Sequence, residues 1–369
     1  MKAPSSQRQK GLASYALSCG LAFSLAASTL FASEDALAVD ATGRLITRVG
    51  IAVNPITHKV YAVDEGTDSV IVTDENTGSA HRVGVGKAPI AIAVLPAVNK
   101  AYVVNTDSDS ISIIDGTQDK VIATIKGGSH PYTVAADKKT NKVYVTYTYD
   151  HILTVIDGVT NAASSLEAGS ADAIEIDETT NTLFLSTYED PFIRIIDAAN
   201  GATRKVRVGG HIWGLAFDAA NSRLYLAHTM TADVVSLDEK TQETAVVPVG
   251  QIPCSLAFNP ATRMLYAVNY GDQTLSVIDT VKMKVVNVLA VGDHPQAIAV
   301  DSKRNLVYVA NVHGDSVTVI DGVKNAILGT YKAGEHPYAL TVDENTGQVY
   351  AAIYGSEASA RVDSTALRK

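Results

Sequence analysis

The sequence predicts an all-β fold, a β-propeller of four-stranded antiparallel blades, and two series of repeated residues carry this prediction. One series is aromatic and recurs every 40–42 residues: Tyr61, Tyr102, Tyr144, Phe184, Tyr225, Tyr266, Tyr308 and Tyr350. The other is an aspartate with the same spacing: Asp74, Asp115, Asp157, Asp197, Asp238, Asp279, Asp321 and Asp363. A period near 41 residues without helical periodicity is typical of propeller blades. Eight blades are favoured, and seven blades with a partial tail are the alternative.

Each copy contains four extended segments. In the seventh copy these are 297–301, 305–311, 316–321 and 326–334, which are apolar or alternate and are bounded by Asp, Asn, Gly or Lys-rich turns. We interpret the aspartates as turn formers and the aromatic series as core, with each ring packed against the neighbouring blade.

The last copy offers only three such segments. Residues 43–49, GRLITRV, resemble the missing fourth strand. We predict that this N-terminal strand pairs with the last blade, because that pairing would close the ring and cover an open strand edge.

The N-terminal segment, residues 1–38, has the pattern of a secretory signal peptide. Three basic residues are followed by a Leu/Ala/Ser-rich run and by Ala36-Leu37-Ala38. We expect cleavage after Ala38, which leaves a single propeller domain at 39–369. The expected location is the periplasm or the exterior, with no transmembrane anchor after cleavage.

The net charge limits the class of partner, and the cysteine content limits the possible disulfides. Removing residues 1–38 takes away three basic and two acidic side chains, so the formal charge changes from −9 to −10. Phosphate backbones repel such a protein, and no nucleic-acid partner is expected. Cys254 is the only cysteine left, so the mature chain forms no internal disulfide, and we interpret this residue as packing.

Three second-strand phrases carry a family resemblance: Tyr102-Val103-Val104-Asn105, Tyr266-Ala267-Val268-Asn269 and Tyr308-Val309-Ala310-Asn311. They resemble the signature of the YVTN-type β-propeller repeat proteins of bacterial and archaeal envelopes, and the resemblance covers residues 44–363. It implies a propeller in or beyond the periplasm. It implies no single activity, because such propellers serve as adhesins, scaffolds and occasional enzymes.

In a propeller, the joins between blades and the hairpins between second and third strands emerge on one face, which we call the mouth face. Binding residues concentrate on loops held by a rigid frame. Four joins carry histidine at one position: His130, His211, His294 and His336. One interpretation is a site for a divalent metal such as zinc or copper, with His294 and His336 as its first ligands. The other, which we favour, is that His-Pro is a good turn.

Further candidates border the channel mouth or lie in the mouth-face hairpins. Those expected to bind a ligand are Tyr132, Trp213, Gln296, Tyr338, His228 and His313. Glu175 places a carboxylate on an inner strand where other copies have a small residue, and it joins Asp172 and Tyr338 as a candidate for acid/base chemistry.

No nucleophile elbow, phosphate-binding loop, H-E-x-x-H or C-x-x-C motif occurs in the sequence. We therefore expect an exported binding or scaffold protein that uses the mouth face to hold a protein or glycan partner. The alternative is a metal-assisted enzyme, a lyase, lactone hydrolase or oxidoreductase, with a His-lined site at the channel mouth.

Overall fold

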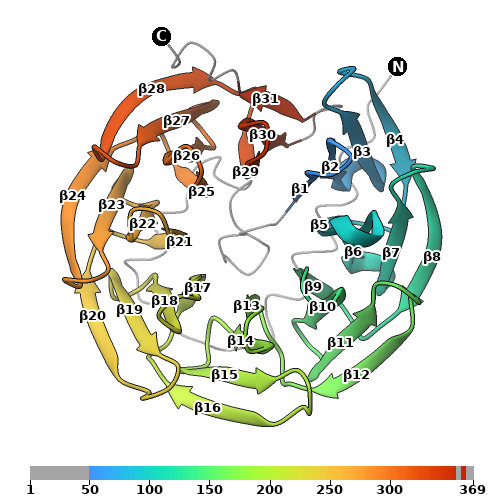
Figure 1. The fold of residues 1–369 in the computed structure, drawn as a ribbon, viewed down its shortest axis with the longest axis horizontal. Coiled ribbons are helices and arrows are strands. Elements are labelled where there is room, and N and C mark those ends of the chain that lie inside the picture. Colours follow the sequence, from blue (N-terminus) through green and yellow to red (C-terminus); the bar gives the residue numbers. More distant parts are fainter. Residues whose placement is uncertain (1–49, 355–358, 363–369) are drawn as a thin grey trace, which may run out of the picture. The chain divides into compact units, whose positions relative to one another are not determined.

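The computed structural model describes residues 50–354 and 359–362, which belong to one unit, Thr47–Lys369. These residues form an eight-bladed β-propeller of antiparallel sheets, confirming the predicted fold class (Figure 1). Blades 1 to 7 have four strands each, and three strands of blade 8 lie among the described residues. In the same part of the chain, no helix has the length and apolar character needed to cross a membrane.

The strands follow one another outward from the channel in chain order. The inner strands are β1 (Ile51–Asn54), β5 (Pro89–Leu95), β9 (Pro131–Asp137), β13 (Ala173–Asp177), β17 (Ile212–Asp218), β21 (Pro253–Asn259), β25 (Pro295–Asp301) and β29 (Pro337–Asp343). The second strands are β2 (Lys59–Asp64), β6 (Lys100–Asn105), β10 (Lys142–Tyr147), β14 (Thr182–Ser186), β18 (Arg223–His228), β22 (Met264–Asn269), β26 (Leu306–Asn311) and β30 (Gln348–Ile353).

The third strands are β3 (Ser69–Asp74), β7 (Ser110–Asp115), β11 (Ile152–Asp157), β15 (Phe192–Asp197), β19 (Asp233–Asp238), β23 (Thr274–Asp279), β27 (Ser316–Asp321) and β31 (Ala360–Val362). The outer strands are β4 (Ala80–Gly84), β8 (Lys120–Lys126), β12 (Ala163–Glu167), β16 (Thr203–Arg207), β20 (Thr244–Pro248), β24 (Lys284–Ala290) and β28 (Ala326–Lys332). Short 3-10 turns lie at Glu65–Thr67, Pro96–Val98 and Thr106–Ser108.

Burial changes from strand to strand across each blade. The second and third strands are almost wholly buried, whereas the outer strands β8 and β24 alternate between exposed and half-buried residues. This alternation is expected of an antiparallel strand with one solvated face.

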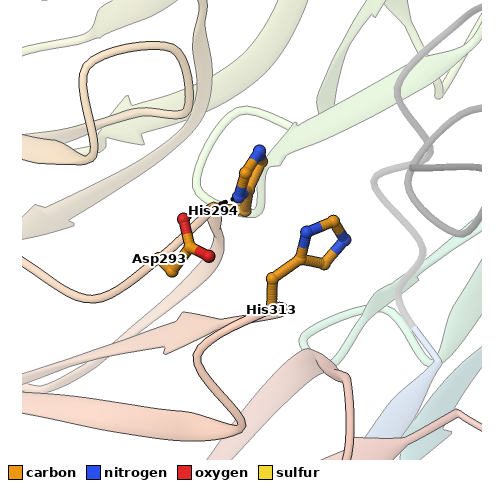
Figure 2. A group of neighbouring side chains, drawn as sticks. All are labelled: Asp293, His294 and His313. Carbon is orange, nitrogen blue, oxygen red and sulfur yellow. Dashed lines mark hydrogen bonds and ion pairs between the residues drawn. The ribbon is translucent and has the colours of Figure 1, made fainter. Parts of the chain in front are cut away.

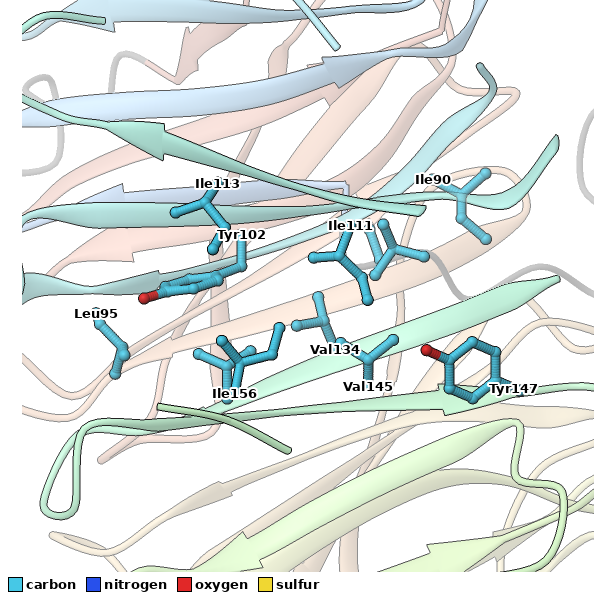
Figure 3. Packing of buried hydrophobic residues seen from close by; sticks show 12 residues of the cluster. Ile90, Leu95, Tyr102, Ile111, Ile113, Val134, Val145, Tyr147 and Ile156 are labelled. Carbon is cyan, nitrogen blue, oxygen red and sulfur yellow. The ribbon is translucent and has the colours of Figure 1, made fainter. Parts of the chain in front are cut away.

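The aromatic series packs between blades, as predicted. All eight rings are at most 3% exposed. Figure 3 shows Tyr102 of blade 2 beside Ile156 of blade 3, within one core cluster. The Tyr102 hydroxyl donates to the Gly158 carbonyl at 3.4 Å. Each fully buried aliphatic side chain contributes about 1.5–3 kcal/mol, so these contacts hold adjacent blades together.

The aspartate series forms turns, which also confirms the prediction for the seven members that the structure describes. Asp115 is representative: its Oδ1 accepts from the backbone N–H of Thr117 at 2.8 Å and of Gln118 at 2.9 Å. Equivalent bonds from Thr77 and Thr160 lower the pKa values of Asp74 and Asp157. Asp363 lies outside the described residues.

Blade 8 packs directly on blade 1. Ile51 and Tyr350 share a core cluster, and the Tyr338 hydroxyl donates to the Val63 carbonyl at 3.3 Å. Gly50 permits this approach, since a Cβ there would lie 2.5 Å from the Tyr338 ring. The predicted closing strand, residues 43–49, lies outside the described residues.

Candidate functional site

Each histidine of the joins occupies a left-handed turn. The φ angles of His130, His211, His294 and His336 lie between 50° and 64°. Their carbonyls accept from the hairpin that follows the second strand: the Val312 N–H donates to His294 at 3.0 Å. Joins and hairpins therefore meet on the mouth face. Histidine is among the residues enriched in left-handed backbone, which gives His-Pro a structural reason at these positions.

The turn does not require an imidazole. Ala88 and Ile252 occupy the same position in blades 2 and 6, with φ angles of 51° and 53°. Their carbonyls accept the equivalent bonds from Thr106 and Tyr270. The side chains at the histidine positions are therefore free to serve something besides the turn.

Two of the four join histidines pack on separate aromatic rings. The His130 ring lies 5.1 Å from that of Tyr149, and the His211 ring lies 4.9 Å from that of Tyr188. These two residues contact different blades, so each has its own neighbours on the mouth face.

The other two approach a third histidine. The His313 ring lies 4.3 Å from that of His294 and 5.9 Å from that of His336. His313 belongs to the β26–β27 hairpin and thus lies between the two histidines that the sequence places on adjacent blades. The structure therefore groups His294, His313 and His336.

A cavity of about 280 Å³ lies at the mouth end of the inner strands. Residues from seven inner strands line it, including five of the predicted site residues: Asp172, Glu175, Trp213, Gln296 and Tyr338. The cavity thus brings together five of the residues that the sequence assigned to the channel, but not Tyr132.

Glu175 lies on β13, opposite Phe184 of β14. Its side chain keeps some surface open to the cavity but is otherwise enclosed by protein. Burial raises the pKa of Glu175 to about 7, more than a backbone hydrogen bond from Ile176 lowers it. The carboxyl group is therefore present in both protonation states near neutral pH, as general acids and bases are.

Trp213 borders the cavity from β17 and is 9% exposed. Its ring meets that of Tyr188 edge-on at 5.2 Å. The indole N–H is buried and makes no hydrogen bond to any residue that the structure describes. Buried donors nearly always have a partner, so this group is an unusual feature of the cavity wall.

Asp172 and Tyr338 each form a hydrogen bond to the backbone of the propeller. Asp172 Oδ2 accepts from the Tyr188 backbone N–H at 2.9 Å and so holds the β14–β15 hairpin. The Tyr338 hydroxyl is bonded to blade 1, as described above. Gln296 is 3% exposed, with its side chain in the cavity wall.

The remaining ligand-binding candidates lie away from the cavity. Tyr132 is half-buried against the core between blades 2 and 3. His228 is 4% exposed, its Nδ1 lies 3.0 Å from Asp233 Oδ1, and burial lowers its pKa. At the equivalent position, Asn269 and Asn311 donate hydrogen bonds to hydroxyl groups of the following hairpin. This position therefore has a structural role.

Cys254 is buried, and burial raises the pKa of its thiol to about 12. A thiolate is the reactive form of cysteine, so this residue is inert at neutral pH. The structure supports its interpretation as a packing residue.

Sequence reasoning missed Asp293, whose Oδ1 lies 2.8 Å from His294 Nδ1. Figure 2 shows Asp293, His294 and His313 gathered around a common space. The available signal was that the seventh copy alone combines an acid-His-Pro join with a histidine in the following hairpin.

A second group was also missed. His58 Nδ1 lies 3.2 Å from Asp343 Oδ2 and 3.5 Å from Glu75 Oε2, at the contact between blades 8 and 1. Burial, followed by the charge of Asp343, raises the pKa of Glu75.

Comparisons with known proteins agree with the fold. The sequence model of a family described as "Lactonase, 7-bladed beta-propeller" matches residues 227–332. No curated protein matches the chain. Similar solved structures include Kuenenia stuttgartiensis hydrazine synthase, at 19% identity and a TM-score of 0.59 over 85% of this chain and 95% of that one. Another is "Dihydro-heme d1 dehydrogenase NirN in complex with DHE", at 14% identity and a TM-score of 0.68 over 86% of this chain and 75% of that one.

Proposed function

We propose that the chain is an exported binding protein of the bacterial envelope, located in the periplasm or at the cell surface, and that its ligand enters the mouth of the central channel. One observation carries the proposal: polar side chains from three blades, those of Asp172, Glu175, Trp213 and Gln296, converge on one cavity. A concave site with a few convergent polar groups is the usual form of a ligand site.

The lining indicates the class of ligand. Among the described residues, the wall contains two carboxyl groups and no lysine, arginine or histidine. An anion would be repelled, whereas hydroxyl groups can donate to the carboxylates, and sugar rings can pack on Trp213. The cavity of about 280 Å³ is small for a ligand site. We therefore favour the end of a glycan over a protein partner, which would need a broad surface.

The unpartnered indole N–H of Trp213 supports this choice, because a ligand oxygen would provide its missing acceptor. NirN, which has a similar fold, is described in complex with DHE, although 14% identity gives no information on the ligand of this chain.

The test is a glycan array probed with untagged mature protein, followed by calorimetric titration of any glycan that binds. Glu175→Gln should weaken binding, whereas Glu243→Gln should not, because Glu243 is exposed in the turn before β20. An empty array together with a protein captured specifically by the mouth face would favour a protein partner instead.

The second candidate is an enzyme, such as a lactone hydrolase. The pKa of Glu175 near 7 favours it, since a carboxylate of that basicity can activate water. The lactonase family match over residues 227–332 points the same way. Acid release from γ- and δ-lactones, followed with a pH indicator and lost in Glu175→Gln, would support hydrolysis; no release above background would exclude these substrates.

A further inference from the structure

Blade 7 brings three side chains with metal-binding atoms together on the mouth face. Ligand atoms of Asp293, His294 and His313 all lie within 4.8 Å of one another. Ligands around a tetrahedral zinc ion are roughly 3.4 Å apart, given metal–ligand distances near 2.1 Å. Small side-chain rotations would therefore bring the three groups onto one ion.

Other blades show that the fold does not need these side chains. Ala88 and Ile252 serve the turn where blade 7 has His294. Where blade 7 has His313, after the hairpin residue that donates to the join, blades 2 and 6 have Asp107 and Gly271. Blades 2 and 6 thus serve as an internal control: they fold without these side chains, so folding does not require the metal-binding groups of blade 7.

The two loops that carry the cluster are tied together. The Gly292 N–H donates to Asn311 Oδ1 at 3.0 Å, and the Gly314 N–H donates to the Asp293 carbonyl at 3.3 Å. With the bond from Val312 to His294, three hydrogen bonds join the β24–β25 join to the β26–β27 hairpin. The backbone positions are therefore fixed before any ion binds, which reduces the entropy lost on binding.

A neighbouring aromatic ring also restricts the orientation of the His294 imidazole. Tyr270 packs edge-on against His294 at 4.9 Å. The Asp293 side chain is 47% exposed and that of His294 is 27% exposed, so an ion can reach them from solvent.

We propose that Asp293, His294 and His313 form a binding site for a divalent transition metal, with Zn²⁺ as the best fit. Two imidazoles and one carboxylate suit zinc, whereas Ca²⁺ and Mg²⁺ prefer all-oxygen sites. His336, whose ring lies 5.9 Å from that of His313, is positioned to become the fourth ligand. The site is separate from the channel cavity and does not depend on the proposed ligand there.

Calorimetric titration of untagged mature protein with ZnCl₂ at pH 7.5 tests the site. We expect one Zn²⁺ per chain. Affinity should fall at least about tenfold in His313→Asn, because even the loss of an outer-shell partner of a metal ligand costs about 10–100-fold. Binding should weaken at pH 5.5, because protons compete for the imidazoles. MgCl₂ and CaCl₂ should give no comparable binding.

His130→Asn is the matched control, because His130 lies in an equivalent join outside the cluster. If His313→Asn fails to fold, Asp293→Asn applies the same test at an exposed position. Absence of Zn²⁺ binding, equal affinity in the folded cluster variants, or equal loss in His130→Asn would overturn the proposal.

Discussion

The imidazole of His313 lies 4.3 Å from that of His294, centroid to centroid, although the two residues are 19 positions apart in the chain. The approach follows from the propeller: a join and a hairpin of the same blade emerge on one face and are hydrogen-bonded to each other. The equivalent backbone bond occurs in blades 2, 3, 5, 6 and 8, so the mouth face has a regular backbone on which the side chains differ from blade to blade.

Replacing Asn311 should destabilise the mouth face. Its Nδ2 donates to Ser316 Oγ at 3.1 Å and Thr318 Oγ1 at 3.0 Å, and its Oδ1 accepts from Gly292. Asn311→Ala leaves buried partners unsatisfied, so we expect a loss of about 1–3 kcal/mol in the free energy of unfolding. Chemical denaturation measures it.

The control for this change is Asn76→Ala, at an exposed turn position, which should be nearly neutral. Equal stability of Asn311→Ala and the wild type would show that the buried amide is not needed by the frame.

Replacing Gly158 should weaken the packing between blades 2 and 3. A Cβ there would lie 2.7 Å from the Asn141 carbonyl oxygen and 3.2 Å from the Tyr102 hydroxyl. Gly158→Ala should therefore cost about 1–3 kcal/mol through overpacking. At Gly84 a Cβ would meet nothing within 4 Å, so Gly84→Ala should leave the melting temperature nearly unchanged. Similar melting temperatures for both variants would contradict the described packing.

Much of the propeller could be predicted from the sequence, because the repeat imposes one environment on the eight aromatic positions and on the seven described aspartate positions. The side-chain groupings could not. His228 appears in the sequence as a hairpin histidine like His313. It is buried beside Asp233, because it is the last residue of β18, the position at which blades 2, 6 and 7 have asparagine. The pKa of Glu175 depends on how deeply the inner strands enclose it, which sequence spacing does not determine.

The burial of Glu175 makes stability depend on pH. Its pKa is near 7 in the folded chain and about 4.5 when unfolded, so the folded state binds the proton more tightly. This contribution to stability is complete below pH 4.5 and is lost as the pH rises through 7. In Glu175→Gln, stability is not lost in this way as the pH rises, because the amide does not titrate.

The melting temperature of Glu175→Gln relative to the wild type should therefore rise between pH 5 and pH 8. Glu243→Gln, with an exposed carboxylate, should show no such trend. A difference that stays constant with pH would indicate that Glu175 titrates normally.

Thiol reactivity tests both the burial of Cys254 and the predicted processing. The native mature protein should react negligibly with a thiol reagent at pH 8, since the thiol is buried and its pKa is about 12. After denaturation one thiol should react if residues 1–38 have been removed, and two if Cys19 is retained. Rapid reaction of the native protein would contradict the buried position.

Calorimetric titration of the array-selected glycan shows whether the ligand binds in the channel. We expect binding to the wild type that is about tenfold weaker in both variants: Glu175→Gln replaces a carboxylate by a neutral amide of the same shape, and Trp213→Phe removes the indole N–H. Unchanged affinity in both variants, with their fold intact, would place the binding site outside the channel cavity.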